Sequence, residues 1–261
     1  LLCFSSRGKV YWLKVYQVPR ASRSARGRPI INLLPLLEDE RINAVVPVRE
    51  FSADLYVFMA TSKGRVKKTS LESFSRPRNS GIIGIDLRDG DRLVDVAITD
   101  GKTDIMLGAS SGKAIRFNES DVREMGRGAA GVRGIKLEGN YEVISLITVG
   151  EGDILIATAN GFGKRTRVDE FSTQGRGGKG VIAIQTSDRN GATIGATQVS
   201  DEDEIMLISS SGTLVRTSVD DISTQGRNTQ GVRLIRLQEG DRLVGLDKIV
   251  QIQDDEAIEA E

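Results

Sequence analysis

The sequence contains no histidine and only one cysteine, Cys3, among its 261 residues. Without histidine the chain cannot assemble a Ser-His-Asp triad, a Cys-His dyad or a histidine metal site. A single cysteine excludes a disulfide framework and a cysteine zinc site. No apolar run approaches the roughly 18 residues that a membrane span requires, and no secretory signal opens the chain. We therefore expect a cytoplasmic protein that does not enter a membrane.

Aromatic residues make up only 5% of the chain, too few for stacking platforms along single-stranded nucleic acid. The net charge is zero, with 36 basic and 36 acidic residues, which by itself argues against a nucleic-acid partner. The balance is uneven, because the last eight residues hold five acids and no base. Setting those five acids aside leaves a body of about +5. We expect a folded domain over residues 1–252 and a flexible acidic tail over residues 253–261.

Glycine is plentiful, with 29 residues, whereas proline contributes only 5. The chain also repeats itself. Gly90–Val94 recurs as Gly240–Val244, 150 residues on, and Ser172–Arg176 recurs as Ser223–Arg227, 51 residues on. Both shifts fit a period near 50 residues, which is typical of repeat architectures.

The repeat can be followed five times along the chain. An apolar run ends at a turn glycine, and a second glycine follows 17 to 19 residues later, each opening a run of alternating side chains. The turn glycines are Gly8, Gly64, Gly112, Gly161 and Gly212, and the second glycines are Gly27, Gly81, Gly131, Gly180 and Gly231. This pattern predicts four short strands per repeat and no helix. The fold class is therefore all-β, a propeller-like ring of small sheets.

Basic residues also recur with the repeat. Four repeats carry a cation four residues after the turn glycine, and further cations surround the second glycine. Such a belt would suit duplex DNA, whose phosphates attract cations and release counterions. The alternative is that these are ordinary solvated strand positions, which any repeat would multiply. The candidate DNA-binding residues are Arg26, Arg28, Lys67, Lys68, Arg76, Arg78, Arg116, Arg127, Arg133, Lys164, Arg165, Arg176, Lys179, Arg216, Arg227 and Arg233.

Two glycine-rich segments, Gly126–Gly131 and Gly175–Gly180, match the pattern G-x-G-x-x-G. A dinucleotide site needs a helix after this pattern, whereas here an alternating run follows each segment. We therefore expect no nucleotide site. Exposed glycines beside arginine and lysine would let a phosphate backbone approach the backbone N–H groups. The alternative is a loop that simply needs a positive φ.

Several segments resemble the C-terminal domain of the DNA gyrase A protein, part of the type IIA DNA topoisomerases. The similarity runs from Leu1 to about Val250. It implies a β-pinwheel, a propeller-like ring whose strands are swapped between blades, usually with six blades where five repeats are visible here. The segments that carry the resemblance are Phe4–Tyr11, Lys14–Tyr16, Ala25–Ile30, Gly163–Thr166 and Gly226–Val232.

The family's signature is the gyrase box, Gln-Arg-Arg-Gly-Gly-Lys-Gly, which normally lies near the first blade. Gln174–Gly180 differs from that box at one position, but it stands in the fourth visible repeat. We interpret it as the equivalent segment of another blade.

The resemblance implies that the domain binds and wraps duplex DNA around a basic outer rim without reading its sequence. The holoenzyme can then introduce negative supercoils. Partners would be DNA, the rest of the gyrase A protein and the gyrase B protein, in the bacterial cytoplasm at the nucleoid, and the isolated domain would be a monomer. No cofactor is expected in this domain, since ATP and Mg²⁺ belong to other parts of the holoenzyme.

The resemblance also implies that this fragment alone performs no catalysis, because the tyrosine nucleophile of the family lies in the N-terminal cleavage domain. Two alternatives remain open. One is a topoisomerase IV-type domain that binds DNA with weak or no wrapping. The other is a propeller that binds proteins.

Overall fold

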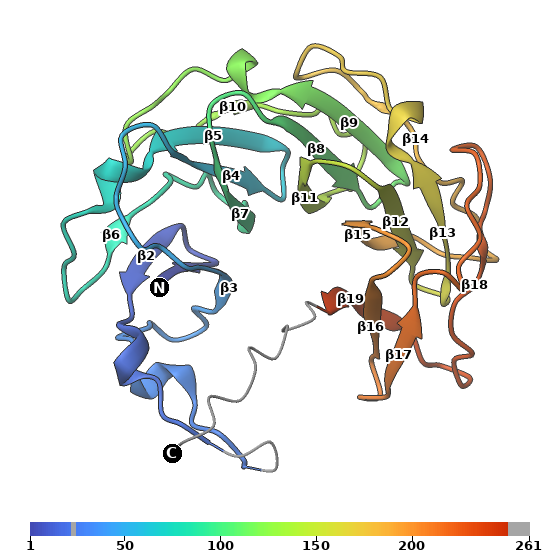
Figure 1. The fold of residues 1–261 in the computed structure, drawn as a ribbon, viewed down its shortest axis with the longest axis horizontal. Coiled ribbons are helices and arrows are strands. Elements are labelled where there is room, and N and C mark those ends of the chain that lie inside the picture. Colours follow the sequence, from blue (N-terminus) through green and yellow to red (C-terminus); the bar gives the residue numbers. More distant parts are fainter. Residues whose placement is uncertain (22–24, 250–261) are drawn as a thin grey trace, which may run out of the picture. The chain divides into compact units, whose positions relative to one another are not determined.

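The computed structural model describes residues 1–21 and 25–249, so the predicted acidic tail lies outside the described residues. Their regular structure consists of nineteen strands and five short 3-10 turns. The strands form five antiparallel sheets (Figure 1), which confirms the all-β prediction and the five repeats. In the described part of the chain, no helix is long and apolar enough to cross a membrane.

The chain forms two compact units. Unit 1 combines Leu1–Gly150 with Phe171–Ile182, and unit 2 combines Glu151–Glu170 with the described residues from Ala183 onward. The segment Phe171–Ile182 thus leaves its sequence neighbours and joins the sheets of unit 1.

Unit 1 contains three four-stranded sheets. The first has the order β3 (Ile42–Val46), β1 (Leu2–Ser5), β2 (Lys9–Trp12), β6 (Ile82–Ile83). The second has the order β10 (Val132–Arg133), β5 (Arg65–Ser70), β4 (Tyr56–Thr61), β7 (Leu93–Thr99). The third has the order β11 (Val143–Val149), β8 (Asp104–Ala109), β9 (Lys113–Asn118), β14 (Val181–Ile182).

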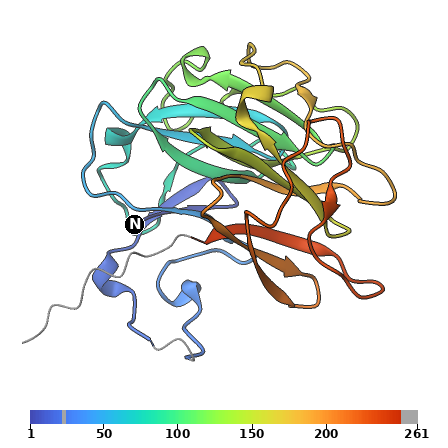
Figure 2. The same cartoon turned by 45° about the vertical axis from the view of Figure 1, so that its right-hand side comes forward.

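Unit 2 contains two sheets, whose strands Figure 2 shows from another side. The four-stranded sheet has the order β15 (Thr193–Val199), β12 (Asp153–Thr158), β13 (Phe162–Arg167), β18 (Val232–Arg233). The three-stranded sheet has the order β17 (Leu214–Ser218), β16 (Glu204–Ser209), β19 (Leu243–Ile249).

In each four-stranded sheet, one of the two edge strands comes from the repeat that follows in the sequence. Strand β6 of the second repeat pairs with β2 of the first, and β18 of the fifth repeat pairs with β13 of the fourth. Strands β10 and β14 join the second and third sheets in the same way. This exchange confirms the strand swapping that the resemblance implied.

The first repeat departs from the prediction. Gly27 was expected to open a strand, but the segment instead contains the 3-10 turn η2 (Ile30–Asn32). Pro29 immediately precedes this turn. Because proline has no backbone N–H, it cannot donate to a strand ladder at that point.

Local sequence explains the hairpins. The turn residue Gly161 has a φ of +81°, a conformation that L side chains rarely adopt. A Cβ atom there would lie 2.7 Å from the carbonyl oxygen of Ile235. Glycine is therefore required both by the turn and by the close approach of the next repeat.

Three further 3-10 turns lead into loops that carry the chain from one sheet back to the preceding sheet. They are η3 (Leu71–Phe74), η4 (Glu119–Asp121) and η5 (Val168–Glu170), while η1 (Val15–Gln17) lies in the first repeat. We call residues 75–81, 122–131, 171–180 and 223–231 the crossing loops. Each ends at a second glycine and enters a swapped strand.

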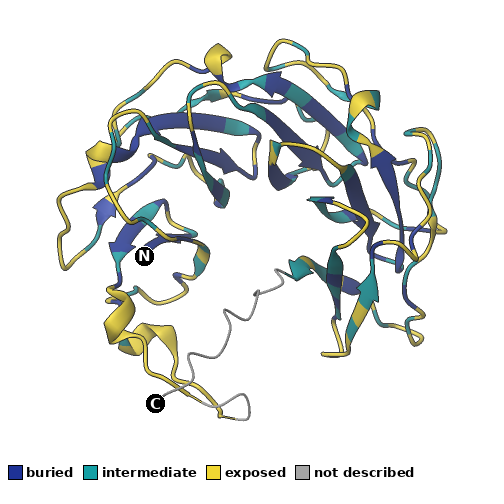
Figure 3. Ribbon diagram, in the orientation of Figure 1, coloured by how far each residue is buried: buried dark blue, intermediate teal, exposed yellow. Residues whose placement is uncertain are grey.

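Apolar side chains pack between the sheets within each unit. In unit 1, Phe4 and Phe74 contact edge to face with ring centroids 6.0 Å apart, and Phe58 packs beside Phe117. Figure 3 shows buried strand centres and largely exposed crossing loops. The strands thus supply the core and the crossing loops supply accessible surface.

Candidate nucleic-acid interface

The cations four residues after the turn glycines do not all reach the surface. Lys68 and Arg165 are each only 7% exposed, and Arg116 is half-buried. Arg216 is exposed. The expectation of an exposed cationic belt at this position is therefore not met by Lys68 or Arg165.

Each of these cations has a partner twelve residues earlier on the neighbouring strand. The partners are a carboxylate in three repeats and an aromatic ring in the other. The pairs are Lys68 over the Tyr56 ring at 5.1 Å, Arg116 with Asp104 at 2.9 Å, Arg165 with Asp153 at 3.9 Å, and Arg216 with Glu204. This spacing is readable in the sequence and would have identified these cations as internally paired.

Three of them also bind the following repeat. Lys68 donates to the carbonyl of Glu119 at 3.0 Å, and Arg116 donates to that of Phe171 at 3.2 Å. Arg165 Nε donates to the carbonyl of Ile222 at 2.6 Å. All three carbonyls lie at or beside the turn that precedes a crossing loop. These cations therefore tie consecutive repeats together within a unit.

Lys67 and Lys164 are fully buried, each with 0% exposure. The Lys67 ammonium donates to the carbonyls of Gly84, at 2.6 Å, and Arg127. Burial lowers its pKa to about 7. As placed, this side chain holds the crossing loop 122–131 and does not reach a phosphate outside.

Lys164 repeats the arrangement in unit 2. Its ammonium donates to the carbonyls of Arg227, at 2.7 Å, and Gly226, and burial lowers its pKa to about 8. The third repeat has Ile115 at the corresponding position. At this position of the repeat, three residues after the turn glycine, a buried lysine therefore takes the place of an apolar core residue.

The remaining candidates lie on the crossing loops, the swapped strands and the first repeat. Arg127 and Arg227 are half-buried, and the others are exposed. The exposed ones are Arg26, Arg28, Arg76, Arg78, Arg133, Arg176, Lys179 and Arg233. Four of these eight side chains therefore lie on the crossing loops, which are drawn largely in yellow in Figure 3.

These exposed side chains are held to different degrees. Arg176 donates from Nε to the carbonyl of Asp121 at 2.8 Å and from Nη1 to that of Arg133 at 3.1 Å. Lys179 pairs with Glu138 at 2.7 Å, which raises the pKa of Lys179. Within the described residues, no hydrogen bond or ion pair engages the side chains of Arg76 and Arg78.

The glycines of the two G-x-G-x-x-G segments differ in the space that a side chain would have. Gly131 and Gly180 have positive φ, and a Cβ atom on either would lie 2.4 Å from a carbonyl oxygen of the adjoining sheet. The fold requires these two glycines. Gly126, Gly128 and Gly175 have no heavy atom within 4 Å of a built Cβ, so another explanation is needed for them.

The segments lead into the two-residue strands β10 and β14 rather than into helices. A dinucleotide site of the kind that G-x-G-x-x-G marks needs a helix N-terminus at this point. The two segments therefore lack the helix that a dinucleotide site of this kind requires.

Several cations near the swapped strands were not among the candidates. Arg65 is in register with Arg133 across β5 and β10, and Arg189 lies over the ring of Phe162. Lys113 pairs with Glu138 at 3.4 Å. Arg65 and Lys113 directly follow turn glycines, a repeat position whose recurring charge would have pointed to them.

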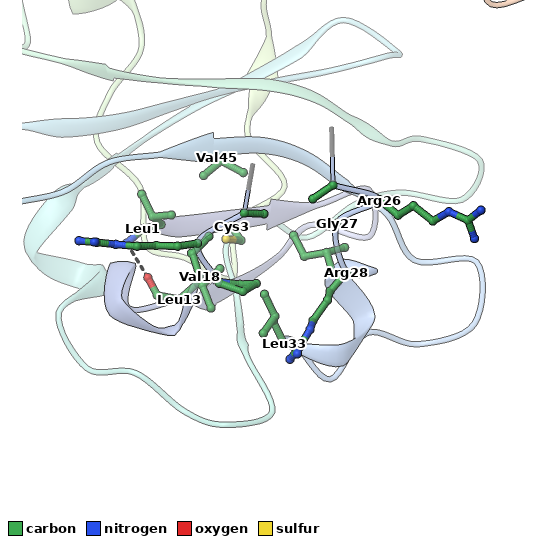
Figure 4. A pocket seen from close by; sticks show the side chains of 14 residues that line it. Leu1, Cys3, Leu13, Val18, Arg26, Gly27, Arg28, Leu33 and Val45 are labelled. Carbon is green, nitrogen blue, oxygen red and sulfur yellow. Dashed lines mark hydrogen bonds between the residues drawn. The ribbon is translucent and has the colours of Figure 1, made fainter. Parts of the chain in front are cut away.

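Unit 1 also contains a pocket of about 600 Å³ beside the first sheet (Figure 4). Its lining is mostly apolar and includes Leu13, Val18 and Leu33.

Cys3 is fully buried, and burial raises the pKa of its thiol. Because the thiolate is the reactive form, this cysteine is a core residue rather than a nucleophile.

Tyr11 is also unsuited to nucleophilic chemistry. Its hydroxyl donates to the Glu40 carboxylate at 3.0 Å. Burial and this carboxylate raise the pKa of Tyr11 to about 12. The arrangement stabilises the neutral phenol, whereas a nucleophile needs its ionised form to be accessible.

The swapped strands and repeated sheets define a propeller-type repeat protein. A family model described as "DNA gyrase C-terminal domain, beta-propeller" matches residues 1–49, 55–100, 103–149, 152–200 and 203–249. The DNA gyrase A protein of Salmonella typhimurium is 56% identical over 261 residues, and that of Escherichia coli is 54% identical over 260 residues. The chain belongs to the DNA gyrase C-terminal domain family.

These matches cover 100% and 99% of this chain but 30% of each relative, so the chain spans less than a third of their length. Two solved structures are also similar. The gyrase A C-terminal domain aligns with a TM-score of 0.83 and 27% identity, covering 95% of this chain and 82% of that one. The C-terminal domain of DNA topoisomerase IV aligns with a TM-score of 0.87 and 30% identity, covering 95% and 78%.

Proposed function

We propose that this domain binds duplex DNA through its phosphates and without reading its sequence. The observation that carries the proposal is the division of the repeated cations into two sets. One set lies largely inside the sheets and ties repeats together. The other is exposed mainly on the crossing loops and swapped strands, at Arg76, Arg78, Arg133, Arg176 and Arg233, where the charges are accessible to a ligand.

The chemistry of these loops suits a phosphate backbone. Arginine presents a planar fork of donors that matches a phosphate. Gly126, Gly128 and Gly175 leave the backbone open on the side where a Cβ would stand, so a phosphate can approach the N–H groups of the loops. Phosphate contacts position a protein on DNA but carry no sequence information.

We further propose that the domain wraps the duplex and serves a gyrase holoenzyme in negative supercoiling. Membership of the gyrase family supports this, as do cations spread over successive repeats. Bending DNA costs several kcal/mol, which contacts along the bend must offset. ATP and Mg²⁺ would act in the remainder of the gyrase A protein and in the gyrase B protein, in the bacterial cytoplasm. The isolated domain would bind no cofactor and remain a monomer.

The likeness to the topoisomerase IV domain supports a second candidate, a domain that binds DNA with weak or no wrapping. A protein-binding propeller is the third. Salt distinguishes the last from the others, because about ten phosphate contacts give a log–log slope of roughly −9. A protein partner would show a far weaker dependence.

A nick-ligation assay tests the proposal. Nicked circular DNA is mixed with the chain, sealed by ligase, freed of protein and resolved on a gel. A positive shift in linking number is the expected result and means right-handed wrapping. Binding without a shift would support the topoisomerase IV-type candidate. Absence of binding even at low salt would overturn the DNA proposal and favour a protein partner.

A further inference from the structure

One aromatic side chain interrupts the series of residues that follow the turn glycines. The other four repeats have Lys9, Arg65, Lys113 and Thr213 there, and the fourth has Phe162. Phe162 is the first residue of strand β13, next to the swapped strand β18, and is only 7% exposed. Two exposed arginine side chains cover its ring.

Both guanidinium groups lie over the same ring. The guanidinium carbon of Arg189 is 4.8 Å from the ring centroid, and that of Arg233 is 5.3 Å from it. Arg233 is opposite Phe162 in the register of β13 and β18. A cation at this distance from an aromatic face is attracted by the ring quadrupole.

Arg189 stands on a tightly fixed turn. Asn160 donates from Nδ2 to the carbonyl of Arg189 at 3.2 Å. The next residue, Asn190, is fully buried and donates to the carbonyls of Gln185, at 2.7 Å, and Gln230, at 3.1 Å. The Arg189 guanidinium donates to the Gln230 side chain at 3.4 Å. The backbone is thus fixed before any ligand arrives.

We propose that Phe162 is a positioning residue that stacks Arg189 and Arg233 into a phosphate-binding site of the DNA surface. Within the described residues, no ion pair with a carboxylate involves either arginine, so both charges are available to an anion. Both guanidiniums meet one ring and can therefore contact the same stretch of DNA backbone. This inference rests on the proposed DNA binding and assigns a site to it.

The ring matters because a free arginine side chain samples many rotamers and must be ordered on binding. Stacking restricts that freedom while leaving the guanidinium N–H edges available to a phosphate. Leucine at position 162 would keep an apolar side chain between the strands but would present no π face. Tyrosine would keep the ring.

The test uses the complete 261-residue chain and a fluorescently labelled duplex of mixed sequence, titrated over a range of salt concentrations. Phe162→Leu is expected to weaken binding about fivefold, and Phe162→Tyr to bind like the parent chain. Replacing both arginines with alanine is expected to make the salt slope about 1.8 less negative. In that double-alanine background, adding Phe162→Leu should change nothing further.

The inference is overturned if Phe162→Leu binds as tightly as the parent chain, or if it weakens binding equally in the double-alanine background. Urea unfolding of each variant separates lost affinity from lost folding. If Phe162→Leu fails to fold, the variant with both arginines replaced by alanine decides, because both side chains are exposed and their loss should not prevent folding. An unchanged salt slope of DNA binding in that variant refutes the site. If the parent chain itself binds no duplex at low salt, the proposed function fails rather than this assignment alone.

Discussion

Replacing Lys67 with methionine should make the stability of the protein respond differently to pH. Burial lowers the pKa of this ammonium from an ordinary 10.5 to about 7 in the folded chain. Between these values the unfolded chain binds more protons than the folded one. The free energy of unfolding therefore rises with pH over this range, and this contribution disappears when Lys67 is replaced.

The magnitude follows from the two pKa values. One pKa unit corresponds to about 1.4 kcal/mol. Between about pH 7 and about pH 9.5, the folded protein should therefore gain about 3 kcal/mol relative to Lys67→Met. The pKa of Lys164, lowered to about 8, gives a smaller gain of about 2 kcal/mol relative to Lys164→Met over the same range.

The assay is urea unfolding of the parent chain and both variants at several pH values, with the exposed Lys63→Met as the matched control. The control should keep the pH response of the parent chain. A stability difference between parent and Lys67→Met that stays constant from about pH 7 to about pH 9.5 would refute the reasoning. It would mean that the carbonyls of Gly84 and Arg127 keep the ammonium charged throughout.

Three further predictions concern the two sets of cations and the tail. Replacing both Arg76 and Arg78 with alanine should make the salt slope of DNA binding about 1.8 less negative while changing urea stability by less than about 0.5 kcal/mol. Arg165→Met should lower the free energy of unfolding by about 2–3 kcal/mol and leave the salt slope of DNA binding unchanged. Deleting residues 253–261 should tighten binding at low salt in an anisotropy titration, and unchanged affinity would show that the tail does not compete with DNA.

The repeat and its strands could be predicted because their signals are local. A turn glycine, an alternating run and a fixed period each constrain only a few neighbouring residues. The structure confirms them in four repeats and differs after Gly27. There the local pattern predicted a strand, but a strand also needs a partner and a donor, and Pro29 has no backbone N–H to supply one.

The candidate site was harder to predict, because recurrence alone does not separate a buried cation from an exposed one. Lys67 and Arg76 are both basic residues of the second repeat, and the sequence pattern does not show which of them is buried. Only the tertiary packing shows that Lys67 faces the carbonyl oxygens of Gly84 and Arg127 inside the fold, while Arg76 lies in an exposed crossing loop.

The sequence by itself determined the period, the strands, the requirement for glycine at the turns and the resemblance to the gyrase family. These follow from backbone sterics and side-chain alternation, which act over a few residues. Only the tertiary structure decided which cations are internal ties and which are accessible, and that Phe162 gathers Arg189 and Arg233. Those outcomes depend on contacts between residues from different strands, loops and repeats, where desolvation and partner geometry determine the role of each charge.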